Sequence, residues 1–485
     1  MPEKPELSYK QTLQMRRSYL GKSVKLHFDV KPVKLVRGSR QYLYDDSGNE
    51  YLDCISNVSH VGHCHPHVVH AGQEQMAKLT TCSGFLNEKM VDYCKRIIAT
   101  LPDKLCVCYF LNSGSEANDM ALRLARAFTG HDDVICLDNA YHGNIEQLLE
   151  VSPSRWKKCG IIKKDWVHTV PCPDTYRGKY REDSQNPGLL YANEVKDAIN
   201  KAIANGRNIA AFLSETVISS SGYINPPDKY FKHAYRHVRE AGGLCIADEV
   251  QVGMGRTGEH FWSFQNFDVI PDIVTVGKPL GNGHPMALVI TTKEIADSVC
   301  EYSNSFGGNP VACAVGIAVL DVIKNEQMLS SAKSVGKCLL DGFRAILPNH
   351  PMMGDVRGIG LAIGVEIVMD KESRKPAKEA AEILAYKMKE KKIIISNEGP
   401  DKNVMCLIPP MCFTCENARR VVQAMDIALS DIEKGASEVG LTTATGSSTD
   451  QCEVVPLNIL SADTSQLSDS DDEPNVKRVR YDDVD

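Results

Sequence analysis

The sequence has no run of about 18 consecutive apolar residues, the length that a membrane-spanning helix needs. Its N-terminal segment, MPEKPELSYKQTLQMRRSYLG, lacks the apolar stretch of a secretory signal, and Glu3 and Glu6 are unusual in a mitochondrial transit peptide. Neither charge is in strong excess, because 55 Lys and Arg stand against 62 Asp and Glu, a net charge of −7. We therefore expect no membrane partner and no nucleic-acid partner. The expected compartment is the cytoplasm, with the mitochondrial matrix as the alternative.

Apolar residues and cysteines are plentiful. Of the 485 residues, 43% are hydrophobic and 24% are charged, which is typical of a globular protein with a large core. The 17 cysteines are scattered without a secretion signal, so we expect reduced thiols that pack as small core residues. Cys412-Phe-Thr-Cys415 and His63-Cys-His65-Pro-His67 have spacings that metal sites use. A lone C-x-x-C pair is a weak signal and a packed turn explains the histidines, so we expect no bound metal.

Short apolar runs alternate with helical patterns through the middle of the chain. This alternation is typical of a parallel sheet with helices on both faces, and the predicted fold class is α/β. The predicted strands are Val107–Leu111, Val134–Leu137, Ile209–Leu213, Leu244–Ala247, Ile273–Val276 and Ala287–Thr291. The predicted helices are Glu116–Ala127, Phe231–Ala241 and Val311–Lys324.

A smaller α/β unit is predicted after the last of these helices. GDVRGIGLAIGVEIV, KKIIISNEG and VMCLIPP have strand patterns, and PAKEAAEILAYKMKEK has the pattern of an amphipathic helix. QYLYDDSGNEYLD predicts a hairpin that joins this unit or leads into the large one. From about Gly435 the composition is rich in Ser, Thr, Asp and Gly, which predicts a disordered tail. The expected division is an N-terminal segment (1–60), a large domain (61–325), a small C-terminal domain (326–434) and a tail (435–485).

The segment CIADEVQVGMGRTG holds Gly253, Gly255 and Gly258 at the G-x-G-x-x-G spacing of a dinucleotide-binding loop. In such a loop the glycines come within one or two residues of the end of a strand, and a helix begins in the loop. Here Asp248–Val252 intervene, and the aromatic segment EHFWSFQNF without helical periodicity follows. The glycines fit a flexible active-site turn better, so a nicotinamide enzyme is only the third hypothesis.

Two charged residues follow buried strands at the edge where parallel sheets bind ligands. Asp248 closes one strand, and Lys278 comes directly after IVTV and Gly277. A buried carboxylate needs a cationic or hydrogen-bonding partner, which a protonated pyridine nitrogen would supply. A lysine that bonds covalently to the cofactor and an acid that faces its ring nitrogen are the minimum for pyridoxal phosphate chemistry.

Three further segments would complete such a site. FLNSGSEAND predicts a strand, a turn with Gly114 and Ser115, and a helix start, whose backbone N–H groups bind anions. Asn139–Gly143 follows another strand and would place Tyr141 or His142 over the ring. Glu215, two residues beyond its predicted strand, would organise the same crevice.

Six motifs together resemble the class III aminotransferases of pyridoxal phosphate fold type I. They are GHCHP (62–66), NSGSEAND (112–119), AYHG (140–143), ADEVQVGMGRTG (247–258), GK (277–278) and SFGGNP (305–310). The resemblance covers about residues 20–435 and implies a large domain with a mostly parallel seven-stranded sheet, a smaller α/β domain and a homodimer. Within the class the chain is similar to the branch of ethanolamine-phosphate phospho-lyase, phosphohydroxylysine phospho-lyase and the alanine–glyoxylate aminotransferase 2-like proteins.

The resemblance implies a role for each matching residue. Lys278 binds pyridoxal 5′-phosphate covalently and moves the substrate proton, Asp248 pairs with the ring nitrogen, and Gln251 contacts the ring oxygen. The other implied cofactor-binding residues are Gly114 and Ser115 for the phosphate, Tyr141 for stacking, His142 and Glu215 in the same crevice, and Ser305 from a second subunit.

The chain departs from the branch where cations are expected. Gly84 stands where relatives have Arg, and Cys406 and Ile408 precede Pro409-Pro410 where relatives have Arg or Lys. Each lost charged hydrogen bond to a substrate anion costs about 1.5–3 kcal/mol.

The residues shared with the class do not distinguish transamination of a small amine or amino acid from elimination of phosphate from a phosphorylated amine. The alternative is a cofactor-binding relative with a non-catalytic role, against which the retained Lys278 and Asp248 argue.

Overall fold

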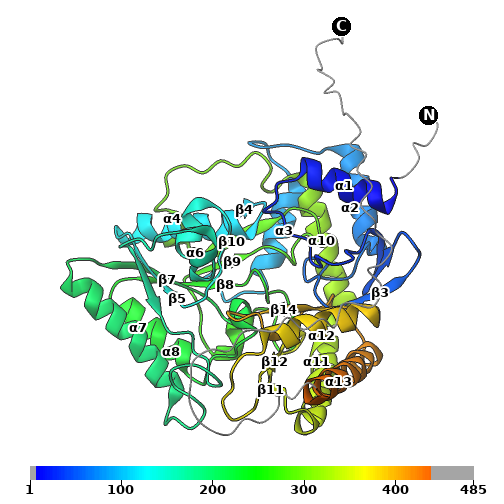
Figure 1. Cartoon of the computed structure of the whole chain (residues 1–485). Helices are drawn as coiled ribbons and strands as arrows, with labels where there is room; N and C mark the ends of the chain where they lie inside the picture. The colour runs from blue at the N-terminus through cyan, green and yellow to red at the C-terminus, as the bar shows by residue number, and fades with distance from the viewer. Residues whose placement is uncertain (1–6, 439–485) are drawn as a thin grey trace. The chain divides into compact units, whose positions relative to one another are not determined.

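The computed structural model describes residues 7–438, and a seven-stranded sheet forms the largest layer (Figure 1). Strand β10 is antiparallel to both neighbours, and the other neighbouring strands run parallel. This confirms the mostly parallel seven-stranded sheet. In spatial order the strands are β4 (Val107–Leu111), β10 (Ala287–Thr291), β9 (Ile273–Val276), β8 (Leu244–Asp248), β7 (Ile209–Glu215), β5 (Asp133–Leu137) and β6 (Val167–Val170).

The central strands read as continuous apolar runs because both of their faces are covered. Along β7, Ala211 and Leu213 belong to a core shared with α4 (Gly114–Thr129), whereas Phe212 belongs to the core shared with α8 (Tyr230–Glu240). Helix α7 (Pro187–Ala204) packs beside α8, and Figure 1 shows this pair away from α4. Every residue of β7 is therefore buried, which fits a strand inside a parallel sheet.

Two four-stranded sheets lie outside the large sheet. β13 (Ile393–Ile394) pairs in parallel with β3 (Glu50–Asp53), so the N-terminal hairpin joins the smaller α/β unit, one of the two predicted alternatives. One sheet has the order β1 (Leu35–Ser39), β2 (Tyr42–Asp45), β3 (Glu50–Asp53) and β13 (Ile393–Ile394), and the other β11 (Met353–Ile359), β12 (Ala362–Ile367), β15 (Val404–Leu407) and β14 (Ser396–Glu398).

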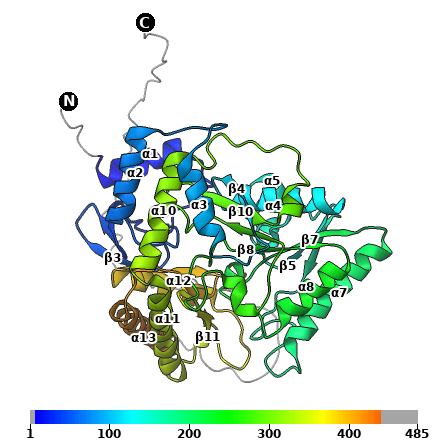
Figure 2. The ribbon, with the colours of Figure 1, turned by 180° about the vertical axis from the view of Figure 1, so that it is seen from behind.

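Helix α10 (Pro310–Asn325) runs from the helices near the N-terminus to the smaller sheets, as Figure 2 shows. It begins with Pro310, and the Asn309 side chain accepts a hydrogen bond from the Ala312 N–H at 2.9 Å, a standard helix start. It packs against α2 (Pro66–Lys78), α3 (Glu88–Ile98) and α11 (Met328–Ile346). The other helices are α1 (Tyr9–Tyr19), α5 (Glu146–Glu150), α6 (Pro153–Cys159), α9 (Lys293–Ala296), α12 (Lys378–Glu390) and α13 (Cys415–Glu438), with 3-10 turns at Ser219–Ser221, Ser263–Phe267 and Leu347–Asn349.

Every strand and helix predicted along the large sheet is present, with bounds that differ by at most two residues. Strand β6 was not predicted, because VHTV is short and follows no clear apolar run. Glu215 is the last residue of β7 rather than a residue beyond it. Helix α13 extends to Glu438, and the rest of the predicted tail lies outside the described residues.

A disulfide joins Cys338 on α11 to Cys415 at the start of α13, which corrects the expectation of reduced thiols throughout. The two cysteines are 77 residues apart in the sequence, so no local spacing could have predicted the pair. Cys412, the other member of the C-x-x-C motif, is free, and burial raises the pKa of its thiol to about 12.

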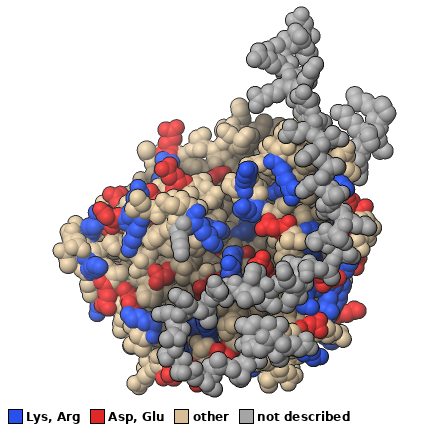
Figure 3. Space-filling view, viewed as in Figure 1, with Lys and Arg blue, Asp and Glu red and all other residues tan. Residues whose placement is uncertain are grey.

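Charge is dispersed over the visible surface. Lys and Arg side chains alternate with Asp and Glu side chains on the face shown in Figure 3. No helix within residues 7–438 has the length and apolar character required to cross a membrane.

Candidate active site

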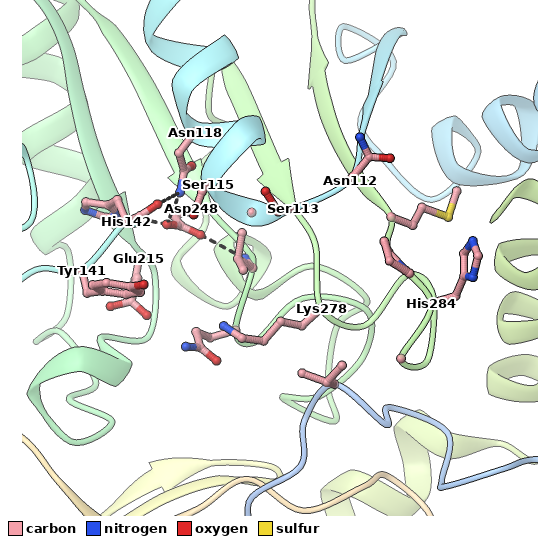
Figure 4. Close-up of a pocket in the computed structure, with 18 residues that line it drawn as sticks. Asn112, Ser113, Ser115, Asn118, Tyr141, His142, Glu215, Asp248, Lys278 and His284 are labelled. Carbon is pink, nitrogen blue, oxygen red and sulfur yellow. Dashed lines mark hydrogen bonds and ion pairs between the residues drawn. The ribbon is translucent and has the colours of Figure 1, made fainter. Parts of the chain in front are cut away.

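A pocket of about 320 Å³ lies where the parallel strands β7, β8 and β9 end (Figure 4). This edge of the sheet is where α/β proteins bind ligands. All the predicted cofactor-binding residues except Ser305 line it. The full lining is Val58, Asn112, Ser113, Gly114, Ser115, Asn118, Tyr141, His142, Gly143, Glu215, Asp248, Val250, Gln251, Lys278, Gly283, His284, Pro285 and Met286.

Asp248 ends β8, and three hydrogen bonds hold its buried carboxylate. Oδ2 accepts from Asn118 Nδ2 and from His142 Nδ1, both at 2.8 Å, and Oδ1 accepts from the Val250 N–H at 3.0 Å. Donors thus approach both carboxylate oxygens. The carboxylate is thus fixed in orientation and lines the pocket.

Asn118 and Thr275 belong to this network, and the sequence reasoning missed both. Asn118 Oδ1 accepts from Thr275 Oγ1 at 2.6 Å, so the amide must turn its nitrogen toward Asp248. Two signals were present in the sequence. Asn118 lies one helical turn after Gly114, and Thr275 is the polar residue in the apolar run IVTV, opposite Asp248 in the sheet register.

Lys278 follows β9 and extends across the pocket toward the side where Tyr141, His142 and Glu215 lie (Figure 4). Within residues 7–438 its amine has no hydrogen-bond partner. Burial lowers the pKa of the amine, and the charges of Asp248 and Glu215 partly oppose this. A lysine with a lowered pKa is more often neutral, which is the form that attacks a carbonyl.

Glu215 is held at the pocket by the turn that follows its strand. Ser219 Oγ and Ser220 Oγ donate to its two carboxylate oxygens, the second at 3.2 Å. Burial, followed by the charge of Asp248, raises the pKa of Glu215. It therefore adds a polar group to the crevice, as predicted, from the end of the strand.

Gly114 and Ser115 line the pocket at the start of α4. Ser113 Oγ caps the helix by accepting from the Glu116 N–H at 3.2 Å, and the N–H groups of Gly114 and Ser115 make no hydrogen bond within residues 7–438. A Cβ atom at position 114 would lie 2.7 Å from Val250 Cγ1, so only glycine fits there. Free N–H groups at a helix start bind a phosphate without a cation.

The structure decides which aromatic side chain can cover a bound ring. The His142 side chain is buried and bonded to Asp248, so Tyr141 is the one left to face a ligand. The Arg155 guanidinium lies over the Tyr141 ring, with Cζ 4.7 Å from the ring centroid. His142 therefore supports Asp248 rather than covering the pocket.

Gln251 lines the pocket, whereas Ser305 does not. The Gln251 side chain is held by Asn57, whose Nδ2 donates to Gln251 Oε1 at 2.5 Å. Ser305 is exposed in the segment before α10, so within this one chain it does not reach the site.

Two side chains of the histidine-rich turn contact buried or half-exposed carboxylates. His63 Nε2 lies 2.7 Å from Asp53 Oδ2, and His65 Nε2 lies 2.8 Å from Glu326 Oε1. The described part of the chain holds no cluster of three ligands suited to a metal ion.

These features suit one cofactor. A fixed buried carboxylate suits a protonated pyridine nitrogen, an unpaired buried amine suits an aldehyde, and free N–H groups at a helix start suit a phosphate. A mostly parallel seven-stranded sheet with this set at its carboxyl edge defines a pyridoxal-phosphate-dependent enzyme of fold type I. The structure thus confirms the predicted class.

The chain belongs to the class III aminotransferases, because the model of the family "Aminotransferase class-III" matches residues 26–429. It is 46% identical over 422 residues to "Alanine–glyoxylate aminotransferase 2-like" of Drosophila melanogaster, covering 85% of each chain. It is 41% identical to "Ethanolamine-phosphate phospho-lyase homolog 1" of Caenorhabditis elegans, covering 87% of this chain and 94% of the relative. Among solved structures, a phospholyase from Arthrobacter in complex with phosphoethanolamine superposes with a TM-score of 0.82 at 35% identity, covering 86% and 99% of the two chains. The family confirms pyridoxal phosphate as the cofactor.

Proposed function

We propose that the protein is a transaminase that moves the amino group of a small primary amine or amino acid to a keto acceptor. One observation carries this choice over phosphate elimination. Lys278 is the only Lys or Arg among the described residues that line the pocket, and its amine is committed to the cofactor. Arg155 stacks on Tyr141 but does not line the pocket, so a substrate phosphate inside it would lack a lining cation. Charge-assisted hydrogen bonds to such cations are the strong ones in phosphate recognition.

Cys406 and Ile408 do not line this pocket. They stand where the resemblance implies Arg or Lys, and they pack in a separate apolar cluster with Val217, Val252 and Val404. The choice of substrate therefore rests on the residues that do line the pocket.

Each chain residue has a proposed task at the site. When bound, pyridoxal phosphate supplies an electron sink that acidifies the substrate C–H next to nitrogen. Lys278 Nζ removes that proton and returns it at a neighbouring carbon, and the Asp248 carboxylate keeps the ring nitrogen protonated. The Gly114 and Ser115 N–H groups hold the phosphate, and Tyr141 covers the ring.

The test is a parallel assay of the purified protein with phosphoethanolamine, with phosphohydroxylysine and with alanine plus glyoxylate. We expect keto acid from an amino donor and no release of inorganic phosphate above the Lys278→Ala control. Phosphate released together with ammonia from either phosphorylated amine would show a phospho-lyase and contradict the proposal. A bound cofactor that no amine changes would support the non-catalytic alternative.

We further propose that the enzyme is a homodimer in which Ser305 of the partner subunit completes the phosphate site. Apolar side chains that a single chain leaves exposed support this proposal: the exposed fractions are 71% for Phe306, beside Ser305, and 80% and 103% for Phe85 and Leu86. Large apolar side chains that one chain leaves exposed are commonly covered in an interface when they lie together. Sedimentation of the cofactor-loaded protein should give twice the chain mass, and Phe306→Asp should weaken both the association and cofactor binding. A fully loaded monomer would contradict the proposal.

Two expectations remain proposals. We propose a cytoplasmic location, because the two relatives described above have names without a compartment, whereas two relatives named mitochondrial have lower identities of 38% and 36%. Co-fractionation of the chain with the mitochondrial matrix would contradict it. We also retain the predicted domain boundaries near residues 60, 325 and 434, which limited proteolysis would test.

A further inference from the structure

We propose that Asn57 is a positioning residue that sets which end of the Gln251 amide faces the cofactor. The inference rests on the proposed placement of the pyridoxal ring between Lys278 and Asp248. Asn57 itself does not line the pocket, and its neighbours in the sequence form no recognised motif, so neither feature suggests this role.

The orientation of the Asn57 amide follows from its acceptors. Asn57 Nδ2 lies 2.5 Å from Gln251 Oε1 and 3.5 Å from the Gln251 backbone oxygen. A backbone carbonyl oxygen can only accept hydrogen bonds, so the Asn57 atom that faces it must be the donor nitrogen. Because this nitrogen then also faces the Gln251 side chain, the Gln251 oxygen points toward Asn57.

The orientation of the Gln251 amide determines which of its atoms faces the pocket. An amide carries an oxygen that accepts on one side and a nitrogen that donates on the other. With Oε1 engaged by Asn57, Gln251 must present Nε2 toward the pocket that it lines. The group that meets it there has to be an acceptor, which fits the ring oxygen of pyridoxal phosphate in its deprotonated form.

The segment that carries Asn57 is rigid enough to impose this choice. It runs beside the Gln251 segment with a constant offset, because Asn57 contacts Gln251 and His60 contacts Met254, both 194 residues apart in the sequence. His60 Nε2 donates to the Met254 oxygen at 2.9 Å, and its Nδ1 accepts from Arg256 at 3.2 Å. Burial, with the nearby Arg256 charge, lowers the pKa of His60 to about 3, so this contact persists at physiological pH.

Asn57 is also buried, with 6% of its surface exposed, so water cannot easily replace its hydrogen bonds. A change from amide to carboxylate at this position would reverse the pattern, since a carboxylate only accepts. Gln251 would then turn its nitrogen toward residue 57 and its oxygen toward the cofactor. Two oxygens would face each other in the pocket, and the deprotonated ring oxygen would be destabilised.

The experiment follows the visible absorption band of bound pyridoxal phosphate as a function of pH in the holoenzyme. We expect Asn57→Asp to raise the apparent pKa of this band by about one unit and to weaken cofactor binding about tenfold. Asn57→Ala leaves the Gln251 amide free to adopt either orientation, so it should change the apparent pKa and cofactor binding less than Asn57→Asp does. A merely structural role predicts the opposite order, because alanine removes more contacts.

Two further variants separate positioning from other causes. In a Gln251→Ala background, Asn57→Asp should no longer shift the pKa; an undiminished shift would mean that the new charge acts directly and would overturn the inference. Asn282→Asp is the matched control, because Asn282 pins the same segment through Val61 and Gly62 without touching Gln251, and it should leave the band unchanged. A wild-type protein that gives no visible band would instead contradict the proposed function, whereas a normal band that Asn57→Asp leaves unmoved contradicts only the role of Asn57.

Discussion

Replacing Lys278 with alanine is expected to lower transaminase turnover by at least about 1,000-fold. In the proposed function this amine anchors the cofactor covalently and moves the substrate proton, so two functions are lost together. Lys278→Arg should be nearly as inactive, although it keeps a positive charge, because a guanidinium is always protonated and does not attack a carbonyl. The measurement is the single-turnover rate of keto acid formation, together with the absorption band of the bound cofactor.

The matched control is Lys293→Ala. Lys293 begins α9 and is separated from the end of β10 by one residue. Its side chain is 76% exposed, and it pairs only with Asp297 among the described residues. This variant should keep the full rate and the band. Turnover by Lys278→Ala within tenfold of the wild type would show that another group does the chemistry.

Replacing Asp248 with asparagine is expected to lower turnover on the order of 100-fold while the protein stays folded. Asparagine has nearly the same shape but no charge, so in the proposed arrangement the ring nitrogen loses the partner that keeps it protonated. The new NH₂ group must also face one of the present donors, which are Asn118, His142 and the Val250 N–H. The rate of substrate C–H exchange with deuterated solvent should therefore fall with turnover, because proton removal is the step that needs the electron sink.

The neighbouring acid provides the contrast. Glu249 is fully buried, and it accepts from the Ser263 and Phe264 N–H groups at 2.8 Å and from Thr216 Oγ1 at 3.1 Å, away from the pocket. Glu249→Gln should lower the unfolding free energy by about 1–3 kcal/mol, because it places an NH₂ group against a donor. Its cofactor spectrum should not change. If the two variants affected the spectrum equally, Asp248 would have no special relation to the ring.

Local chain patterns were enough to place most of the large sheet. Apolar runs such as Leu244–Ala247 are easily recognised as strands, because in a strand buried on both faces apolar residues need not alternate with polar ones. The ends of these runs also located Asp248 and Lys278, since ligands bind where parallel strands end. Strand β6 escaped prediction because only its two outer residues are buried, so its apolar signal is weak.

The sequence alone was enough to predict some of the residues that meet at the site. The types and order of Gly114, Ser115, Tyr141, Asp248 and Lys278 along the chain sufficed to predict the cofactor, because each motif carries its own local chemistry. The pairing of Asn57 with Gln251, the support of Asp248 by Asn118 and the disulfide between Cys338 and Cys415 were decided only by the tertiary structure. These contacts join residues that are 77 to 194 positions apart, and no periodicity or spacing within one segment records which distant segment will lie beside it.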